Sequence, residues 1–587
     1  MLLYGISNHM SLLMTGRGEF MEKIRKETYK TKIIIVFLLA FAFIGCFILR
    51  AKTVYASDLM SGYQNPEDII ITTPKDKFST KASKISILGA SDYNYPLYLN
   101  GEEIETTLYG FFTVYVDLEV GENEFVFENN GKLKTLTVTR KKSAASSSNS
   151  SGGSSTPTTT PKETYKKYET DTYGVVTANY TMPRTKISAS DLSLMPITKG
   201  TTFRILGEDG NYYKIVDGTY VSKSSVKTYK KTLGNNKISK AVVTDNKKTN
   251  VLVTKLTMDI NTMYSVTMNE KSIELTLYDT VTVKKPTVAS NDTVRAVSVS
   301  VDKKKKTATY EFSLYDDATV CGYDVDFKDG AMFFELKKAP HLKFEGSLEG
   351  AVIYLDAGHG DTDNGALGPL STFGPTEKDI NLAITMYTKE YLEELGATVV
   401  LTRSDDTFYS LSNRVAAIRN LKPDISVSIH GNSIDLTSDY SKSSGFITYY
   451  SYNLLQDVPF IMNESISNAL EFSSREPRSS SLSLTRLTTC PAVLLETKFL
   501  SNPEDYEYLI QDANQQLFAE AIGNAIKEYI EEIAVYEGET IIHIVQKGET
   551  LSAIAKSYGV SLKDILKLNR IDDVNHIISG QKIKIPR

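Results

Sequence analysis

The most informative stretch of the sequence is VIYLDAGHGDTDNG, which begins at Val352 and ends an apolar run in a histidine between two glycines. A histidine in such a turn is most often a solvated loop residue. The flanking glycines nevertheless allow backbone and ligand to approach the His359 ring without an intervening Cβ atom. His359 is therefore a candidate metal ligand if other ligands reach the same place.

Two more polar residues directly follow apolar runs. His430 follows the alternating run in DISVSIHGN, and Glu496 follows Val-Leu-Leu in AVLLETKFLSN. An apolar strand should bury the residue after it, and a buried carboxylate needs a partner. Glu377, in GPTEKD, lies in the first turn of the helix expected after the His359 loop. Because ligands of open α/β sheets bind beyond the carboxyl ends of the strands, we expect these four residues to converge.

Two imidazoles and one carboxylate are the donor set that catalytic zinc prefers, with one position left for water. The candidates His359, Glu377, His430 and Glu496 are 18, 53 and 66 residues apart in sequence order. Such separations exclude a zinc-finger staple and suit ligands gathered from different strands of a folded domain. The spacing leaves open which carboxylate binds the metal.

The elements that must position these residues are apolar runs alternating with amphipathic helices over residues 350–533. The predicted strands are VIYLDAG, TVVLTRS, DISVSIHGN and AVLLETK. The stretch EKDINLAITMYTKEYLEEL predicts a helix that stops at Gly396, with Ile380, Ile384, Tyr387, Tyr391 and Leu395 on one face. A closing helix carries Ile522, Ile526, Tyr529 and Ile533 at the same spacing. This alternation predicts an α/β fold with a mostly parallel sheet and flanking helices.

Residues 350–533 resemble the zinc-dependent N-acetylmuramoyl-L-alanine amidases of the amidase 3 family. The matching stretches, in order, are LDAGHG, EKDINL, LTRSDD, LSNRVAAIRN, VSIHGNS and PAVLLETKFLSNPED. The resemblance implies that His359, Glu377 and His430 bind Zn²⁺ and that Glu496 is the catalytic carboxylate. The implied reaction is hydrolysis of the amide that joins N-acetylmuramic acid to L-alanine of the peptidoglycan stem peptide.

The chain departs from this family in a few places. Lys498 replaces a frequent glycine, a change expected to alter substrate fit or the acidity of Glu496. Arg486 lies in the most divergent stretch, SSREPRSSSLSLTR, so a substrate role for it is the weakest inference. Two alternatives to the amidase stay open: a non-catalytic wall-binding scaffold, and a zinc peptidase acting on the stem peptide.

The last segment, residues 541–587, resembles a LysM module through KGETLSAIA, YGVSLKDILKLN and ISGQKIKIP. Its predicted order is strand, helix, helix, strand. LysM modules bind chains that contain N-acetylglucosamine, so the resemblance implies that this segment binds the peptidoglycan glycan.

Four segments lie between the N-terminal segment and the catalytic region. Residues 68–140 resemble the immunoglobulin-like sandwiches of bacterial surface proteins, which are usually spacers or weak binders. Residues 142–162 are a Ser/Thr-rich linker. Residues 168–228 resemble bacterial SH3-like domains, with Tyr where those families commonly carry Trp. Residues 231–345 are β-rich and carry no motif that assigns a role.

The N-terminal segment, residues 1–56, is a predicted export signal or membrane anchor. It holds 17 uncharged, mostly apolar residues, Ile33 to Leu49, after a cluster of lysines and arginine. Cleavage after Ala56 is favoured, and an uncleaved membrane anchor is the second alternative. A lipoprotein site at Cys46 is less favoured than either. Translation is predicted to start at Met1 or Met21. We expect an extracellular, cell-wall-associated protein, secreted or anchored by this segment.

Composition limits the other possibilities. A net charge of -5 over 587 residues gives no electrostatic reason to expect a nucleic-acid partner. Three cysteines, one of them in the export segment and the other two in different predicted domains, make a disulfide framework unexpected. Composition says nothing of the oligomeric state.

Overall fold

The structure is a computed structural model. It describes residues 65–142, 165–187, 195–343, 346–451, 457–472, 475–536, 540–569, 571, 574 and 577–586. The predicted export segment and the Ser/Thr-rich linker, apart from Lys142, lie outside these residues. Among the described residues, no helix is both long and apolar enough to span a membrane.

The catalytic region contains a six-stranded sheet in the order β28-β27-β29-β32-β30-β31. Its strands are β27 (Val352–Ala357), β28 (Thr398–Leu401), β29 (Ile425–Asn432), β30 (Ile447–Tyr450), β31 (Arg478–Ser479) and β32 (Ala492–Phe499). All neighbours pair in parallel except β30 and β32, which are antiparallel. The four strands expected from the sequence are thus confirmed, and they are consecutive neighbours in the sheet.

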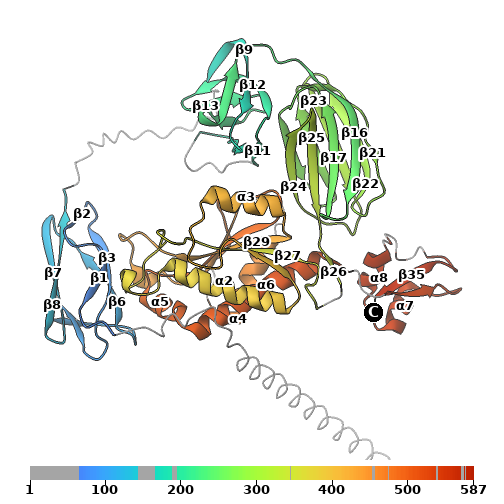
Figure 1. Cartoon of the computed structure of the whole chain (residues 1–587). Helices are drawn as coiled ribbons and strands as arrows, with labels where there is room; N and C mark the ends of the chain where they lie inside the picture. The colour runs from blue at the N-terminus through green and yellow to red at the C-terminus, as the bar shows by residue number, and fades with distance from the viewer. Residues whose placement is uncertain are drawn as a thin grey trace, which may run out of the picture. The chain divides into compact units, whose positions relative to one another are not determined.

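Helices cover both faces of this sheet (Figure 1). One face carries α2 (Glu377–Glu394), α4 (Val458–Leu470), α5 (Pro503–Leu509) and α6 (Asp512–Ile533). The apolar sides of these helices share one core with the strands, as the buried Ile353, Val427 and Ile526 illustrate. The other face carries α3 (Leu411–Leu421), whose Val415 and Ile418 pack on Tyr354.

The N-terminal β unit consists of two sheets, in the orders β1-β3-β6 and β2-β8-β7-β4-β5. Its strands are β1 (Ile70–Thr73), β2 (Phe78–Thr80), β3 (Lys84–Ala90), β4 (Leu97–Leu99), β5 (Glu102–Ile104), β6 (Phe111–Asp117), β7 (Gly121–Asn129) and β8 (Lys132–Arg140). Ile85 and Ile87 from the first sheet and Phe127 and Val138 from the second form one buried cluster. We call this unit the N-terminal sandwich.

Two more β units precede the catalytic region. A five-stranded sheet runs β14-β13-β12-β9-β15, with β9 (Lys166–Val176), β12 (Thr202–Asp209), β13 (Tyr212–Ile215), β14 (Tyr220–Ser222) and β15 (Val226–Tyr229). A second sandwich follows it. One sheet is built on β16 (Asn236–Asn246), β17 (Val251–Met258), β25 (Ala331–Lys338) and β24 (Val320–Lys328). The other comprises β18 (Tyr264–Met268), β19 (Ser272–Tyr278), β23 (Thr307–Leu314) and β22 (Val294–Asp302).

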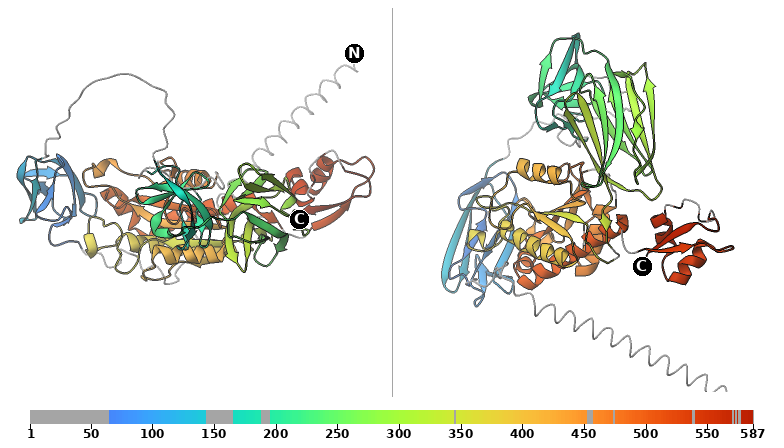
Figure 2. Two further views of the ribbon diagram at one scale, coloured as in Figure 1. Left: turned by 90° about the horizontal axis from the view of Figure 1, so that it is seen from above. Right: turned by 45° about the vertical axis from the view of Figure 1, so that its right-hand side comes forward.

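Figure 2 shows the two sheets of the second sandwich as facing layers. Its buried side chains belong to the same cluster as Val176 and Phe203 of the five-stranded sheet. The C-terminal unit has the expected order of strand, helix, helix, strand: β34 (Thr540–Ile544), α7 (Leu551–Tyr558), α8 (Leu562–Asn569) and β35 (Lys582–Pro586). Its two strands pair antiparallel.

Candidate metal centre and active site

His359 lies in a tight backbone turn in which the preceding residue, Gly358, cannot be replaced by a residue with a side chain. It follows the end of β27 by two residues, and its φ of 61° lies in the left-handed region. A Cβ atom on Gly358 would lie 2.3 Å from Cε1 of His430. Glycine at 358 is therefore what lets the two imidazoles approach each other, as the sequence suggested.

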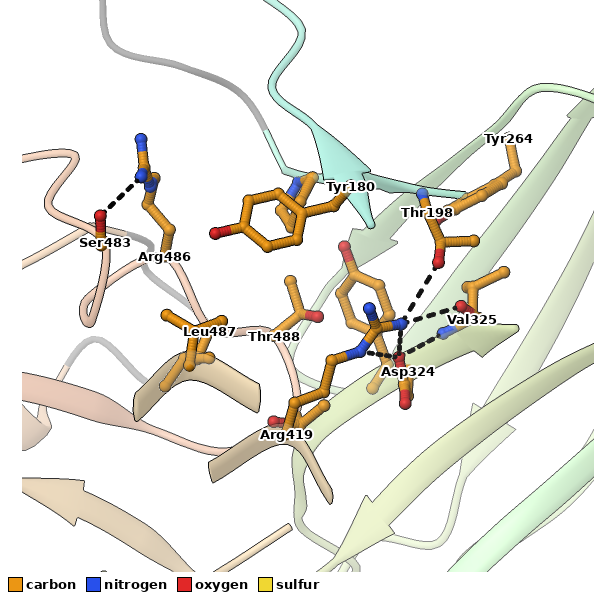
Figure 3. A pocket seen from close by; sticks show the side chains of 14 residues that line it. Tyr180, Thr198, Tyr264, Asp324, Val325, Arg419, Ser483, Arg486, Leu487 and Thr488 are labelled. Atoms are coloured by element: carbon orange, nitrogen blue, oxygen red, sulfur yellow. Dashed lines mark hydrogen bonds and ion pairs between the residues drawn. The ribbon is translucent and has the colours of Figure 1, made fainter. Parts of the chain in front are cut away.

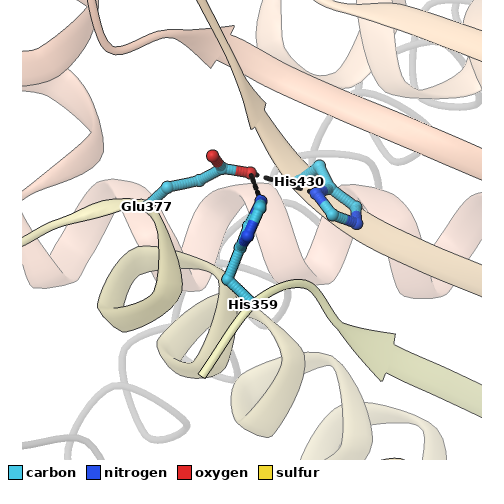
Figure 4. Close-up of side chains that lie close together, drawn as sticks. All are labelled: His359, Glu377 and His430. Carbon is cyan, nitrogen blue, oxygen red and sulfur yellow. Dashed lines mark hydrogen bonds and ion pairs between the residues drawn. The ribbon is translucent and has the colours of Figure 1, made fainter. Parts of the chain in front are cut away.

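His359, Glu377 and His430 converge at the carboxyl edge of the sheet (Figure 4). One carboxylate oxygen, Oε1 of Glu377, lies 3.1 Å from Nε2 of His359 and 3.0 Å from Nδ1 of His430. The two ring centroids are 5.1 Å apart at an interplanar angle of 80°. One ligand atom from each residue falls within 4.8 Å of the other two. The sequence-predicted convergence is confirmed for these three residues.

Glu377 is fixed from several sides. It is the first residue of α2, whose start is stabilised by a capping box between Thr376 and Asp379. Its Oε2 accepts a hydrogen bond from the amide of Ala366 at 2.7 Å, and its Oε1 accepts one from the amide of Gly431 at 3.1 Å. Burial by itself raises the pKa of Glu377, but the two histidines outweigh burial and lower it well below its usual value. Glu377 is thus an anion at neutral pH.

The pKa values of the two histidines are raised, in contrast to that of Glu377. Burial alone lowers the pKa of His359, but the negative charges of Glu377 and Asp363 outweigh it and raise the pKa to about 9. The Oδ2 atom of Asp363 lies 2.9 Å from Nδ1 of His359, on the side of the ring away from Glu377. A carboxylate in this position fixes the orientation of a metal-binding imidazole. Sequence reasoning missed Asp363, although its position four residues after His359 in the same turn was a usable signal.

Glu496 lies beside the cluster on the neighbouring strand. It is the register partner of His430 in the parallel pair β29–β32. Its Oε2 is shielded from solvent and has no hydrogen-bond partner. Burial, with a further contribution from the charge of Glu377, raises its pKa to about 7, against the opposing effect of the two histidines. Glu496 can therefore exchange a proton near neutral pH.

Two buried arginines hold the turn that carries His359. Together, Arg403 and Arg414 donate to all three backbone carbonyls of residues 357–359, at 2.7 to 3.1 Å. Arg414 also pairs with Asp356 at 2.6 Å, and their side chains are 3% and 0% exposed. Guanidinium groups suit this task because their donors are held in a rigid plane. The resemblance included the stretches with both arginines but assigned them no role.

Lys498 has a structural partner of its own. Its ammonium lies 2.7 Å from Oδ1 of Asp505 and 4.2 Å from the ring centroid of Phe472. The charges that act on the pKa of Glu496 are those of His430, Glu377 and His359, and Lys498 is not among them. Because Lys498 pairs with Asp505, the structure gives no support to an effect of Lys498 on the acidity of Glu496, and an effect on substrate fit stays a prediction.

Arg486 is not brought to the cluster. It lines a separate crevice together with Tyr180, Thr198 and Asp324, and its Nη2 donates to Oγ of Ser483 at 3.1 Å (Figure 3). None of the metal-cluster residues lines this crevice. The structure thus gives no support to a substrate role for Arg486.

Comparison with known proteins agrees with this geometry. Residues 353–528 match the N-acetylmuramoyl-L-alanine amidase family, and residues 543–586 match the LysM domain. The chain is 34% identical over 205 residues to the uncharacterized protein YqiI of Bacillus subtilis. This match covers 34% of this chain and 93% of YqiI. It is 32% identical over 191 residues to the probable cell wall amidase LytH of Staphylococcus aureus, covering 32% of this chain and 62% of LytH.

A solved structure, the catalytic domain of the amidase CwlV from Bacillus (Paenibacillus) polymyxa var. colistinus, is 37% identical. The match covers 31% of this chain and 98% of that domain, with a TM-score of 0.29. On the sequence matches, the chain belongs to the N-acetylmuramoyl-L-alanine amidase family and ends in a LysM domain.

The cluster also fits the metal expected for this family. Two imidazole nitrogens and one carboxylate oxygen lie within 4.8 Å of one another, and they are the donors that catalytic zinc takes. The charges of Glu377 and Asp363, which raise the pKa of His359, would equally favour a dication. The cluster therefore supplies both the ligands and the electrostatic field that a Zn²⁺ ion requires.

Proposed function

We propose that this chain is an exported peptidoglycan hydrolase that cleaves the amide between N-acetylmuramic acid and L-alanine of the stem peptide. The observation that carries the proposal is the convergence of His359, Glu377 and His430 beside Glu496, within the segment that matches the amidase family. All four chemical positions are filled, which argues against a scaffold that has lost its activity.

In this proposal His359, Glu377 and His430 hold Zn²⁺. The bound ion would supply a water whose pKa is lowered to about 7 and would polarise the amide carbonyl. Glu496 accepts a proton from the attacking water and donates one to the departing alanine nitrogen. Burial of Glu496 raises its pKa, which favours uptake of the proton from water.

The LysM domain and the N-terminal segment are proposed to determine where the chain acts. The LysM domain binds the glycan and keeps the catalytic domain near its polymer, which raises the local substrate concentration without changing the chemistry. Residues 68–140 are proposed to be immunoglobulin-like and residues 168–228 SH3-like. The N-terminal segment exports the chain to the cell wall, cleaved or retained as an anchor.

The test uses the purified full chain and intact peptidoglycan sacculi. Mass spectrometry of the digest should show glycan strands free of stem peptides, together with released peptides that begin with L-alanine. Bond opening within the stem peptide would instead establish the zinc peptidase. Sacculi that are bound but remain intact, with zinc present in the protein, would establish the scaffold.

A further inference from the structure

Two loops border the metal cluster. The first loop, residues 366–375, leads from the His359 turn to Glu377, and the amide of its Ala366 donates to Glu377 at 2.7 Å. The second loop, residues 433–446, begins after Asn432, at the end of the strand that carries His430. Both loops therefore adjoin metal ligands along the chain, and any segment that fixes the loops also fixes the backbone next to those ligands.

The second loop is held by one buried serine of the N-terminal sandwich. The Oγ atom of Ser86 donates to the carbonyl of Ser438 at 2.8 Å and accepts from the amide of Tyr440 at 3.1 Å. The backbone amide of Ser86 donates to the carbonyl of Leu436 at 2.7 Å. On the neighbouring strand β6, the hydroxyl of Tyr115 donates to the carbonyl of Thr437 at 2.9 Å. Four hydrogen bonds thus tie this loop to strands β3 and β6.

The first loop is held by the same sandwich. The buried hydroxyl of Thr72 donates to the carbonyl of Pro369 at 2.7 Å. The ring of Phe111 lies edge-on to that of Tyr506, with centroids 5.3 Å apart, and the hydroxyl of Tyr506 donates to the carbonyl of Pro375 at 2.8 Å. The loop is thus fixed at one point directly and at another through an aromatic contact.

Apolar packing also joins the sandwich to the catalytic domain. Ala90 and Phe111 of the sandwich are fully buried in the same hydrophobic cluster as the catalytic sheet and its helices. In the reverse direction, Leu436 of the second loop packs on the core of the sandwich. A spacer on a flexible tether would bury no such side chains, so the contact has the character of a domain core rather than of a transient interface.

We propose that the N-terminal sandwich is a structural part of the catalytic unit, whose partner surface is formed by the first and second loops. It orders the two loops next to the metal ligands through Ser86, Thr72 and Phe111, which act as positioning residues. The consequence for hydrolysis rests on the proposed function, whereas the ordering of the loops does not. The usual role of immunoglobulin-like sandwiches as spacers does not describe this one.

The test compares two interface variants of the full chain with two matched surface controls. Ser86→Ala removes the hydroxyl that holds the second loop, and Thr72→Val removes the donor to the first. Ser79→Ala and Thr135→Val make the same chemical changes at exposed positions of the sandwich. Backbone amide hydrogen exchange, read on residues 366–375 and 433–446, reports the order of each loop whether or not the chain hydrolyses peptidoglycan.

Each interface variant should raise exchange in its own loop about tenfold, because the lost hydrogen bonds stabilise the ordered loop. Exchange in strands β7 and β8 should stay as in the wild type, which separates loop loosening from unfolding of the sandwich. The kcat/KM for soluble peptidoglycan fragments should fall about tenfold at unchanged zinc content, since misplaced loops misalign substrate. Both controls should behave as the wild type.

Loop exchange equal to that of the controls would overturn the proposal, as would looser loops with a kcat/KM at the control level. A wild-type chain that releases no stem peptide would instead refute the proposed function, and the exchange data would still decide whether the sandwich orders the loops.

Discussion

Replacing Glu496 by glutamine is the sharpest test of how the site works. The substitution keeps the size of the side chain and removes its ability to take up a proton from water. Proton transfer by one positioned group contributes roughly 10²–10⁴-fold to the rate. We therefore expect kcat of Glu496→Gln to fall by that factor, which corresponds to about 3–5 kcal/mol in the activation barrier.

The same variant should keep its metal and its stability. Glu496 is not one of the three clustered ligands, so zinc content should stay at the wild-type level. Its buried Oε2 has no hydrogen-bond partner, and a neutral amide costs less to bury there than a carboxylate does. The melting temperature should accordingly be equal to or above that of the wild type, as is common where an active site is strained for function.

The assay is release of stem peptides from purified sacculi by the full chain, quantified by mass spectrometry, with zinc measured by elemental analysis. Glu390→Gln, at an exposed position of α2, is the matched control and should be fully active. Glu377→Gln should lose zinc and activity together. A zinc-loaded Glu496→Gln enzyme that retains more than about a tenth of the wild-type rate would refute the assignment of Glu496.

Three further predictions concern the support of the metal site, the pH dependence of zinc binding and the LysM domain. Arg414→Lys keeps the charge but cannot hold Asp356 and the carbonyls of the His359 turn together, so zinc affinity should fall about 10–100-fold in a chelator competition; unchanged affinity would show that the contacts of Arg414 are dispensable. Because the pKa of His359 is raised to about 9, zinc must displace a proton below that pH. Apparent affinity should therefore rise between pH 6.5 and 9, and a falling trend would contradict this. Deleting residues 543–586 should weaken sedimentation with sacculi and leave hydrolysis of soluble fragments intact; equal loss of both would exclude a tether.

The metal cluster could be predicted because its signal is local. His430 and Glu496 each follow an apolar run of the sequence, and neighbouring parallel strands present their carboxyl ends at one edge. The order of the strands was not needed for this inference. Glu377 became a candidate because it lies in the first turn of the helix after the His359 loop. Only the family resemblance indicated that Glu377, and not Glu496, is the metal ligand.

The face of α2 was predicted only in part, and hydrogen bonding explains the difference. Ile380 and Ile384 are buried as expected, but so are Thr385 and Thr388. The two hydroxyls donate to the carbonyls of Asn381 and Ile384, four residues earlier, so both satisfy their polar atoms within the helix. A pattern based on apolar residues alone does not count such threonines as buried.

The support of the site could not be predicted, because it depends on contacts between distant segments. In sequence, Arg403 and Arg414 look like surface charges of a loop and a helix, and charged residues are seldom fully buried unless paired. Only the fold shows that the carbonyls of the His359 turn point toward them. The same holds for Ser86, whose neighbours in β3 give no sign of a loop some 350 residues away.

These supporting contacts explain how a turn with an unfavourable backbone can present a ligand reliably. The left-handed conformation of His359 is one that non-glycine residues rarely adopt, so the surroundings must stabilise it. Arg403 and Arg414 donate hydrogen bonds to the backbone carbonyls of the turn, and Asp363 fixes the His359 ring through Nδ1. With Glu377 anchored by Ala366 and Gly431, each part of the cluster is positioned by a group outside it. Because the site is preorganised in this way, metal binding does not require a loop to become ordered first. Arg403, Arg414 and the N-terminal sandwich therefore all affect the same quantity, which is the fraction of molecules whose site is already formed.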